Sequence, residues 1–202
     1  SLLIPLWNAY SFFVTYANID GYVPSSTPTS SLSNPLDKWI ISDLEKLVKK
    51  ATDAFDSYMI QDATEALLSF IDDLNNWYIR RSRRRFWRSE NDGDKKEAYD
   101  TLYRVLMTVV KVACPMVPFV TEAIYQNLKT ASDPESVHLC FYPEYNEEER
   151  DFKLEEEMNI IMKTIEMGRA LRASSNLKVR QPLKEFVVVS RNSAHRENLE
   201  KN

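Results

Sequence analysis

Glycine is scarce in this chain: only three of its 202 residues are glycine, at positions 21, 93 and 168. Tight turns between β-strands and loops that cradle phosphate both rely on glycine, because it accepts positive φ and lets a ligand approach the backbone. The scarcity therefore disfavours a turn-rich all-β fold and a glycine-rich phosphate loop. Long helices joined by few turns fit better, and 44% hydrophobic with 28% charged residues is ordinary for a globular protein.

Apolar residues recur at helical spacing along most of the chain. Asn34 followed by Pro35 predicts a helix start, with the asparagine as cap and the proline in the first turn. Pro115 and Pro118 interrupt the pattern and separate two helices. The expected helices cover residues 3–20, 36–58, 62–88, 95–113, 119–128 and 154–173.

The remaining segments predict a linker and two extended pieces. Residues 24–35 are rich in serine, threonine and proline, which is typical of a linker. Residues 136–142 fit an extended strip, and residues 186–189 have β character. We therefore expect an all-α helical bundle with a short α+β C-terminal tail. The bundle should occupy residues 1–145, and a helix with a strand-like tail, the start of a junction region, should occupy residues 146–202.

Residues suited to metal binding or catalysis do not gather in the sequence. Cys114 and Cys140 form no close pair and His138 and His195 lie far apart, so no zinc-ligand spacing can be drawn. No Ser-His-Asp set or paired-histidine motif is present, so we expect no catalytic residue and no metal site. The longest apolar stretch, residues 105–120, contains a lysine and two prolines, which indicates core and not a membrane span. The first residues lack the basic region of a signal peptide and look like a cut inside a longer protein.

One short segment differs sharply from the rest of the chain. Residues 76–88 read NWYIRRSRRRFWR, with six arginines, two tryptophans and no acidic residue, in a chain whose formal net charge is −4. The planar guanidinium of arginine binds phosphate through paired hydrogen bonds and stacks flat on bases or rings. A basic, aromatic-rich segment in an otherwise acidic protein points to a nucleic-acid contact.

A helical wheel sorts this segment into two sides. At 100° per residue, five of the six arginines fall within an arc of about 140°. Ile79 and Phe86, seven positions apart, point to the opposite side, so we expect them to pack against the bundle. Arg80, Arg83 and Arg84 have the best claim to solvent and to phosphate.

The other candidates in and beyond this segment each keep two interpretations. Arg81 and Arg85 line up with the apolar stripe, so they fit either phosphate contact or pairing with buried carboxylates. Trp77 and Trp87 fit either core packing or base stacking. Arg180 is a weaker phosphate candidate beside a strand-like segment. The candidate RNA-binding residues are Trp77, Arg80, Arg81, Arg83, Arg84, Arg85, Trp87, Arg88 and Arg180.

Several segments, in order, carry a family resemblance. They are PLWNAYSFFVTYANIDGY, LDKWIISDL, NWYIRRSRRRFW, CPMVPFVTEAIYQNL, SVHLCFYPE and LRASSNLKVRQPL. Together they cover almost the whole chain, which resembles the anticodon-binding domain of class I isoleucyl-tRNA synthetases. The serine- and proline-rich loop, with no zinc tail in view, looks more like a eukaryotic cytosolic enzyme than a bacterial one.

The resemblance implies a fragment of an ATP-dependent isoleucine–tRNA ligase. Activation of isoleucine, with ATP and Mg²⁺, would lie elsewhere in the full protein, and the fragment itself would need no cofactor. Its partners would be isoleucine tRNA and the rest of the synthetase chain, with no membrane and no DNA, in the cytoplasm. The segment around Arg180 would belong to the junction between this bundle and the next part of the synthetase.

Two other interpretations remain at this point. One is the equivalent domain of a sister class I synthetase. The other is a non-catalytic protein-interaction bundle, whose arginines are engaged by acidic partners or by the chain's own residues 144–157, where eight acids face two bases.

Overall fold

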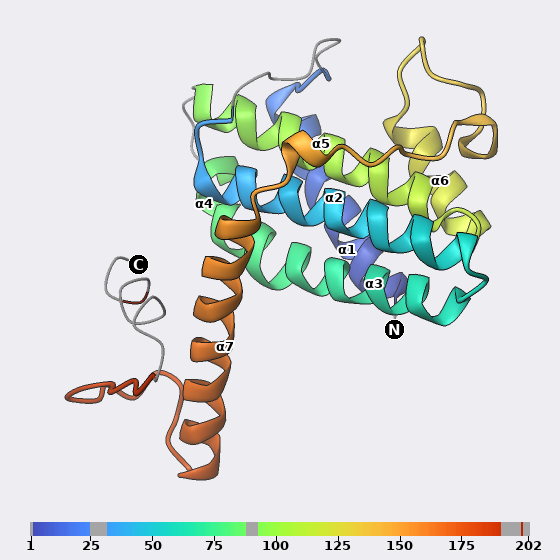
Figure 1. Ribbon diagram of the computed structural model, residues 1–202. Coiled ribbons are helices and arrows are strands. Elements are labelled where there is room, and N and C mark those ends of the chain that lie inside the picture. Colours follow the sequence, from blue (N-terminus) through green and yellow to red (C-terminus); the bar gives the residue numbers. More distant parts are fainter. Residues whose placement is uncertain (1, 25–31, 88–92, 191–198, 200–202) are drawn as a thin grey trace. The chain divides into compact units, whose positions relative to one another are not determined.

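The computed structural model describes residues 2–24, 32–87, 93–190 and 199 (Figure 1). The chain divides into two compact units, Ser1–Arg150 and Asp151–Asn202. All regular secondary structure in the described residues is helical, which confirms the all-α part of the prediction. The predicted division of the chain after residue 145 stays a prediction.

The first unit is a bundle of helices. Its main helices are α1 Leu3–Asp20, α2 Pro35–Asp56, α3 Ile60–Asp73, α4 Arg80–Trp87, α5 Gly93–Ala113 and α6 Pro118–Leu128. Between α3 and α4 the chain continues as a π-helical turn, η1 Leu74–Ile79, so the three elements form one rod. Helix α2 packs against both α3 and α5, as Figure 1 shows, and α1 packs on α5.

Local sequence signals set the helix ends as expected. The side-chain oxygen of Asn34 accepts a hydrogen bond from the Leu36 amide at 2.9 Å, and Pro35 occupies the first turn of α2. Helix α1 ends at Gly21, whose φ of 63° lies in the left-handed region that glycine accepts most easily. Glu97 on α5 accepts hydrogen bonds from the Ser33 and Asn34 amides, which ties the start of α2 to α5.

An aromatic cluster fills the core beneath α4. The Phe86 ring is 1% exposed and makes edge-to-face contacts with Phe12 and Tyr99, with centroids 5.1 and 4.9 Å away. Tyr22 stacks on Tyr99 at 4.9 Å, and Phe13 contacts both rings. The inward side of α4 is therefore held by well-defined ring contacts, each worth roughly 0.5–1.5 kcal/mol beyond burial.

The predicted extended strip at residues 136–142 is wrong. It holds a short 3₁₀ helix, η2 Val137–Leu139, and a second one, η3 Glu147–Glu149, comes after it. Glu122 on α6 accepts hydrogen bonds from the Ser136 hydroxyl and the Val137 amide, at 2.9 and 3.0 Å. Those bonds give the local backbone a partner on α6 instead of a neighbouring strand.

The second unit contains helix α7 Phe152–Ser174 and a subsequent irregular segment. The predicted β character at residues 186–189 is wrong, because these residues have no regular structure. A strand needs a ladder partner for its amides and carbonyls, and the described residues offer no strand. Instead, the Phe186 ring lies on α7 beside Gly168, and Val189 is 90% exposed.

Candidate nucleic-acid interface

The arginine-rich segment lies at the end of the α3–η1–α4 rod, and the π-helical turn sets its orientation. A π turn closes its hydrogen bonds at i→i+5 instead of i→i+4, so residues after it rotate relative to an ideal α-helix. The Asn75 side chain donates to the carbonyls of Ile71, at 2.8 Å, and of Pro5, at 3.2 Å. Asn75 thus provides a donor at the start of the π turn and links it to α1.

Ile79 and Phe86 are both buried, as the wheel predicts. Arg85 is buried beside them, at 7% exposure. Its two terminal nitrogens donate to the two carboxylate oxygens of Asp37 on α2, at 2.8 and 2.7 Å. It also pairs with the Asp94 carboxylate at 2.8 Å. Of its two interpretations, the structure therefore favours pairing with a buried carboxylate, and Arg85 is removed from the RNA-binding set.

Asp37 and Tyr78 complete this buried network. Asp37 is fully buried and accepts a further hydrogen bond from the Tyr78 hydroxyl at 2.6 Å. Burial opposes the charge on Arg85, but its bonds to Asp37 outweigh burial and raise the pKa of Arg85 above its ordinary value. Burial, followed by the charge of Asp37, raises the pKa of Tyr78 well above 10, so the hydroxyl remains a donor. Tyr78 has no exposed ring for a base.

No local sequence pattern points to Asp37 as the partner of Arg85. Asp37 stands in the first turn of α2, where an acidic residue is already explained by the helix dipole. Its helical period places it on the buried stripe with Ile40, Ile41 and Leu44. A charged residue on such a stripe signals a buried partner, because an unpaired buried carboxylate is costly.

Four other arginines are open to solvent. Arg80, Arg81, Arg83 and Arg84 are all exposed, and no described residue of the first unit forms an ion pair with any of them. Trp87, at the end of α4, is 56% exposed. We call Arg80, Arg81, Arg83, Arg84 and Trp87 the arginine face. Arg88 lies outside the described residues.

Trp77 is half-buried and lies beside the arginine face. The guanidinium carbon of Arg81 stands over the Trp77 ring, 5.2 Å from its centroid. The ring is partly packed and partly open to solvent, so core packing and base stacking both stay predictions for Trp77. Arg81 makes a ring contact instead of a carboxylate pair within the described first unit.

The acidic stretch does not neutralise the arginine face within the first unit. Glu149 binds Arg104 on α5 through both carboxylate oxygens, and Glu45 accepts a hydrogen bond from the Asn146 amide at 2.8 Å. The bond from Arg104 lowers the pKa of Glu149, so this carboxylate stays charged and engaged on α5. This part of the acidic stretch is thus committed elsewhere.

Arg180 belongs to the second unit. It is exposed and lies in the turn after α7. The Arg172 guanidinium donates to the carbonyls of Lys178, at 3.0 Å, and Gln181, at 2.8 Å, so the turn that carries Arg180 is anchored to its helix.

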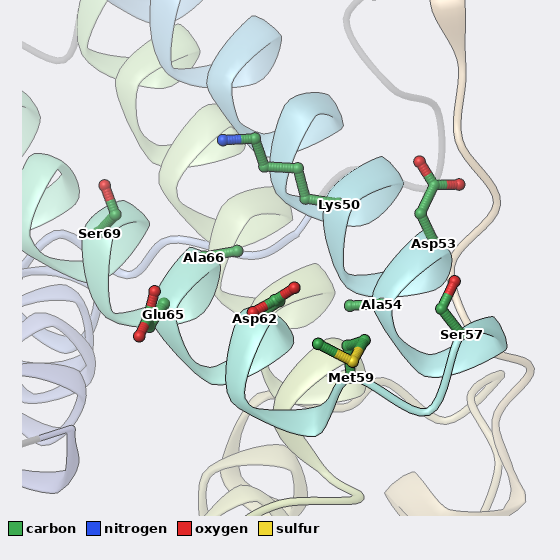
Figure 2. Close-up of a pocket in the computed structure, with 9 residues that line it drawn as sticks. All are labelled: Lys50, Asp53, Ala54, Ser57, Met59, Asp62, Glu65, Ala66 and Ser69. Atoms are coloured by element: carbon green, nitrogen blue, oxygen red, sulfur yellow. The ribbon is translucent and has the colours of Figure 1, made fainter.

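A hollow in the first unit lies away from the arginine face. Its volume is about 560 Å³. It lies between α2 and α3, as Figure 2 shows. Asp53, Asp62 and Glu65 line it together with Lys50. An acidic hollow disfavours a phosphate ligand. Within the described residues, no group of three His, Cys, Asp or Glu side chains could hold a metal ion, and no helix is long and apolar enough to cross a bilayer.

A helical bundle that presents an arginine face with adjacent tryptophans has the features of a nucleic-acid-binding domain. The family described as the anticodon-binding domain of tRNA ligases matches residues 37–187, and this chain belongs to that family. The arginine face and the buried Asp37–Arg85 pair both fall within the matched residues.

Several similar proteins are isoleucine–tRNA ligases. That of Treponema denticola is 53% identical over 95% of this chain and 18% of its own length. Those of Treponema pallidum and Protochlamydia amoebophila are 49% and 47% identical, over 97% and 90% of this chain. The chain spans less than a fifth of the length of these relatives. The resemblance to the isoleucyl-tRNA synthetase domain is confirmed. The expectation of a eukaryotic cytosolic type finds no support, because these relatives are bacterial.

Proposed function

We propose that this domain binds the anticodon arm of an isoleucine tRNA and positions the tRNA for aminoacylation elsewhere in a longer protein. The open arginine face is the observation that carries the proposal. Four exposed guanidinium groups without a carboxylate partner in the described first unit form a site for a polyanion. The similarity to isoleucine–tRNA ligases supports the choice of tRNA.

The spacing of the arginines suits a phosphate backbone. Arg80, Arg83 and Arg84 stand at i, i+3 and i+4 of one helix, so their side chains start about 5–6 Å apart on one surface. They would neutralise successive phosphates of the anticodon loop, and Trp87 offers an exposed ring for a base. Phosphate contacts fix register and carry no sequence information, so the choice among tRNAs depends on base contacts.

The buried network supports this role by keeping α4 rigid. Arg85 joins α4 to α2 through Asp37 and to α5 through Asp94, and Phe86 fixes the same turn in the core. A rigid helix loses little conformational entropy on binding, so the RNA loop supplies the deformation.

The activity of the longer protein is part of the proposal. Isoleucine activation with ATP and Mg²⁺ would occur outside these residues, in the cytoplasm, where tRNA is available. The rest of the synthetase chain would be the second partner, and neither DNA nor a membrane is proposed. Arg180, in the turn after α7, would add a phosphate contact at the junction with that chain.

The test removes two cations from the arginine face. Arg80→Ala with Arg84→Ala should weaken binding of isoleucine tRNA and lower the slope of log affinity against log salt by about one unit for each phosphate that is no longer neutralised. The control is Lys49→Ala with Lys50→Ala, which removes the same charge about 20 Å along α2 from Asp37. Gel shifts at several salt concentrations with isoleucine tRNA, another tRNA and duplex DNA measure both quantities. Equal salt slopes for the two double variants would refute the phosphate assignment and favour a protein-interaction bundle.

A further inference from the structure

The pair formed by Trp77 and Arg81 is the part of the arginine face that phosphate binding does not explain. We infer that Arg81, which stands over the Trp77 ring, is the binding surface for one unpaired base of the anticodon loop. The base would stack on the outer side of the guanidinium, so that ring, cation and base form three layers. The inference rests on the proposed function and adds a base subsite to it.

The pair has the geometry of a cation–π contact. The Arg81 guanidinium carbon lies 5.2 Å from the Trp77 ring centroid, within the distance at which a cation and an indole face attract. Trp77 is half-buried in the π turn, whereas Arg81 is exposed. Trp77 is therefore the more buried member of the pair and supports Arg81, which is the member open to solvent.

The charge of Arg81 is also available. No described residue of the first unit pairs with it, although the same rod carries Asp72 about two and a half turns earlier. The Asp72 carboxylate accepts a hydrogen bond from the Asn76 side chain at 2.7 Å. Arg85, one turn after Arg81, shows the opposite situation, because Asp37 and Asp94 bind its terminal nitrogens.

A base explains this arrangement better than a phosphate does. A phosphate needs charge and donors but gains nothing from a ring beneath the guanidinium, and Arg80 and Arg84 already offer both. A base needs a flat surface of its own size, and a guanidinium restrained by an indole provides one before binding. Arg84, three residues after Arg81, stands beside the pair and would bind the phosphate of the same nucleotide.

The experiment separates the charge of Arg81 from its planar shape, in the whole protein. The probe is an anticodon stem–loop of isoleucine tRNA that carries 2-aminopurine at each loop position in turn, because stacking quenches its fluorescence. Arg81→Lys keeps the charge, so the salt slope should equal that of the unchanged protein. Affinity should fall about five- to tenfold, and quenching at one loop position should disappear.

Two variants of the tryptophan complete the test. Trp77→Phe keeps a ring beneath Arg81 and should retain the quenching, whereas Trp77→Leu should abolish it as Arg81→Lys does. Far-UV circular dichroism and urea unfolding of each variant show whether the fold is intact. Because Arg81 is exposed, Arg81→Lys remains informative even if Trp77→Leu unfolds.

The possible results separate a failure of the base subsite at Arg81 from a failure of the proposed tRNA binding. Quenching that survives in Arg81→Lys, with unchanged affinity, would overturn the base subsite and leave the stack as a structural contact. A normal salt slope in the Arg80→Ala, Arg84→Ala variant would overturn the proposed function first. If Arg81→Lys bound the stem–loop more weakly but left the quenching at every loop position unchanged, Arg81 would be a phosphate contact and the inference would be wrong.

Discussion

Arg85→Met should destabilise the chain strongly, because it breaks a buried ion pair from one side. Methionine keeps most of the volume of the side chain, so the change tests charge more than packing. It leaves the fully buried Asp37 carboxylate without its cation, while the Tyr78 hydroxyl still donates a hydrogen bond to it. Removing one partner of such a pair costs about 3–5 kcal/mol of unfolding free energy.

The geometry of the network places the expected loss within that range. The two bonds to Asp37 are both shorter than 3 Å and both buried, so they account for most of the cost. The ion pair with Asp94 adds about 0–1 kcal/mol, because the Asp94 side chain is 35% exposed and water screens the pair. We therefore expect a loss of about 4 kcal/mol near neutral pH.

The pH dependence and a double variant identify the cause. Without Arg85, the pKa of Asp37 should rise further, because burial then acts without its opposing cation. The variant should therefore lose less stability at acidic pH, where Asp37 is protonated, than at pH above neutral. Adding Asp37→Asn should recover about half of the loss, because no buried charge remains. Urea unfolding, followed by far-UV circular dichroism, measures the free energy of unfolding of the unchanged chain, of Arg85→Met and of the double variant. A loss below about 1 kcal/mol for Arg85→Met, or no recovery in the double variant, would refute the reasoning.

Two further substitutions test other features of the first unit. Burial, followed by the charge of Asp43, raises the pKa of Asp73 to about 7, so the stability of the chain should fall as pH rises from about 4 to 7. Asp73→Asn should therefore raise the free energy of unfolding by about 1–2 kcal/mol at pH 8 and leave it unchanged at pH 4. Equal effects at both pH values in urea unfolding would contradict this. Gly21→Ala should lower the free energy of unfolding by about 1 kcal/mol, measured by thermal unfolding, because φ is 63° at this position and no neighbouring atom would contact the new Cβ. Gly93→Ala is the control, since its new Cβ has equal space and its φ is not positive. Equal losses in the two variants would exclude the backbone explanation.

Much of the fold can be predicted from local sequence patterns. Helix propensity, apolar spacing and caps act over a few residues, so the asparagine cap at Asn34 and the glycine end at Gly21 appear where they are expected. The arginine cluster and its resemblance to a synthetase domain are likewise visible in the letters alone. Residues 186–189 show the limit, because β character produces a strand only where a partner strand is present.

The division of labour among the arginines depends on contacts that sequence spacing does not contain. A wheel of 100° per residue groups Arg81 with Arg85, yet the first lies on Trp77 in solvent and the second is buried against Asp37. The partner of Arg85 is 48 residues away in the chain and lies on a different helix. Local pattern thus establishes that cations gather at this place. Burial, which depends on how separate helices meet, settles which of them hold the fold together and which remain open to a polyanion.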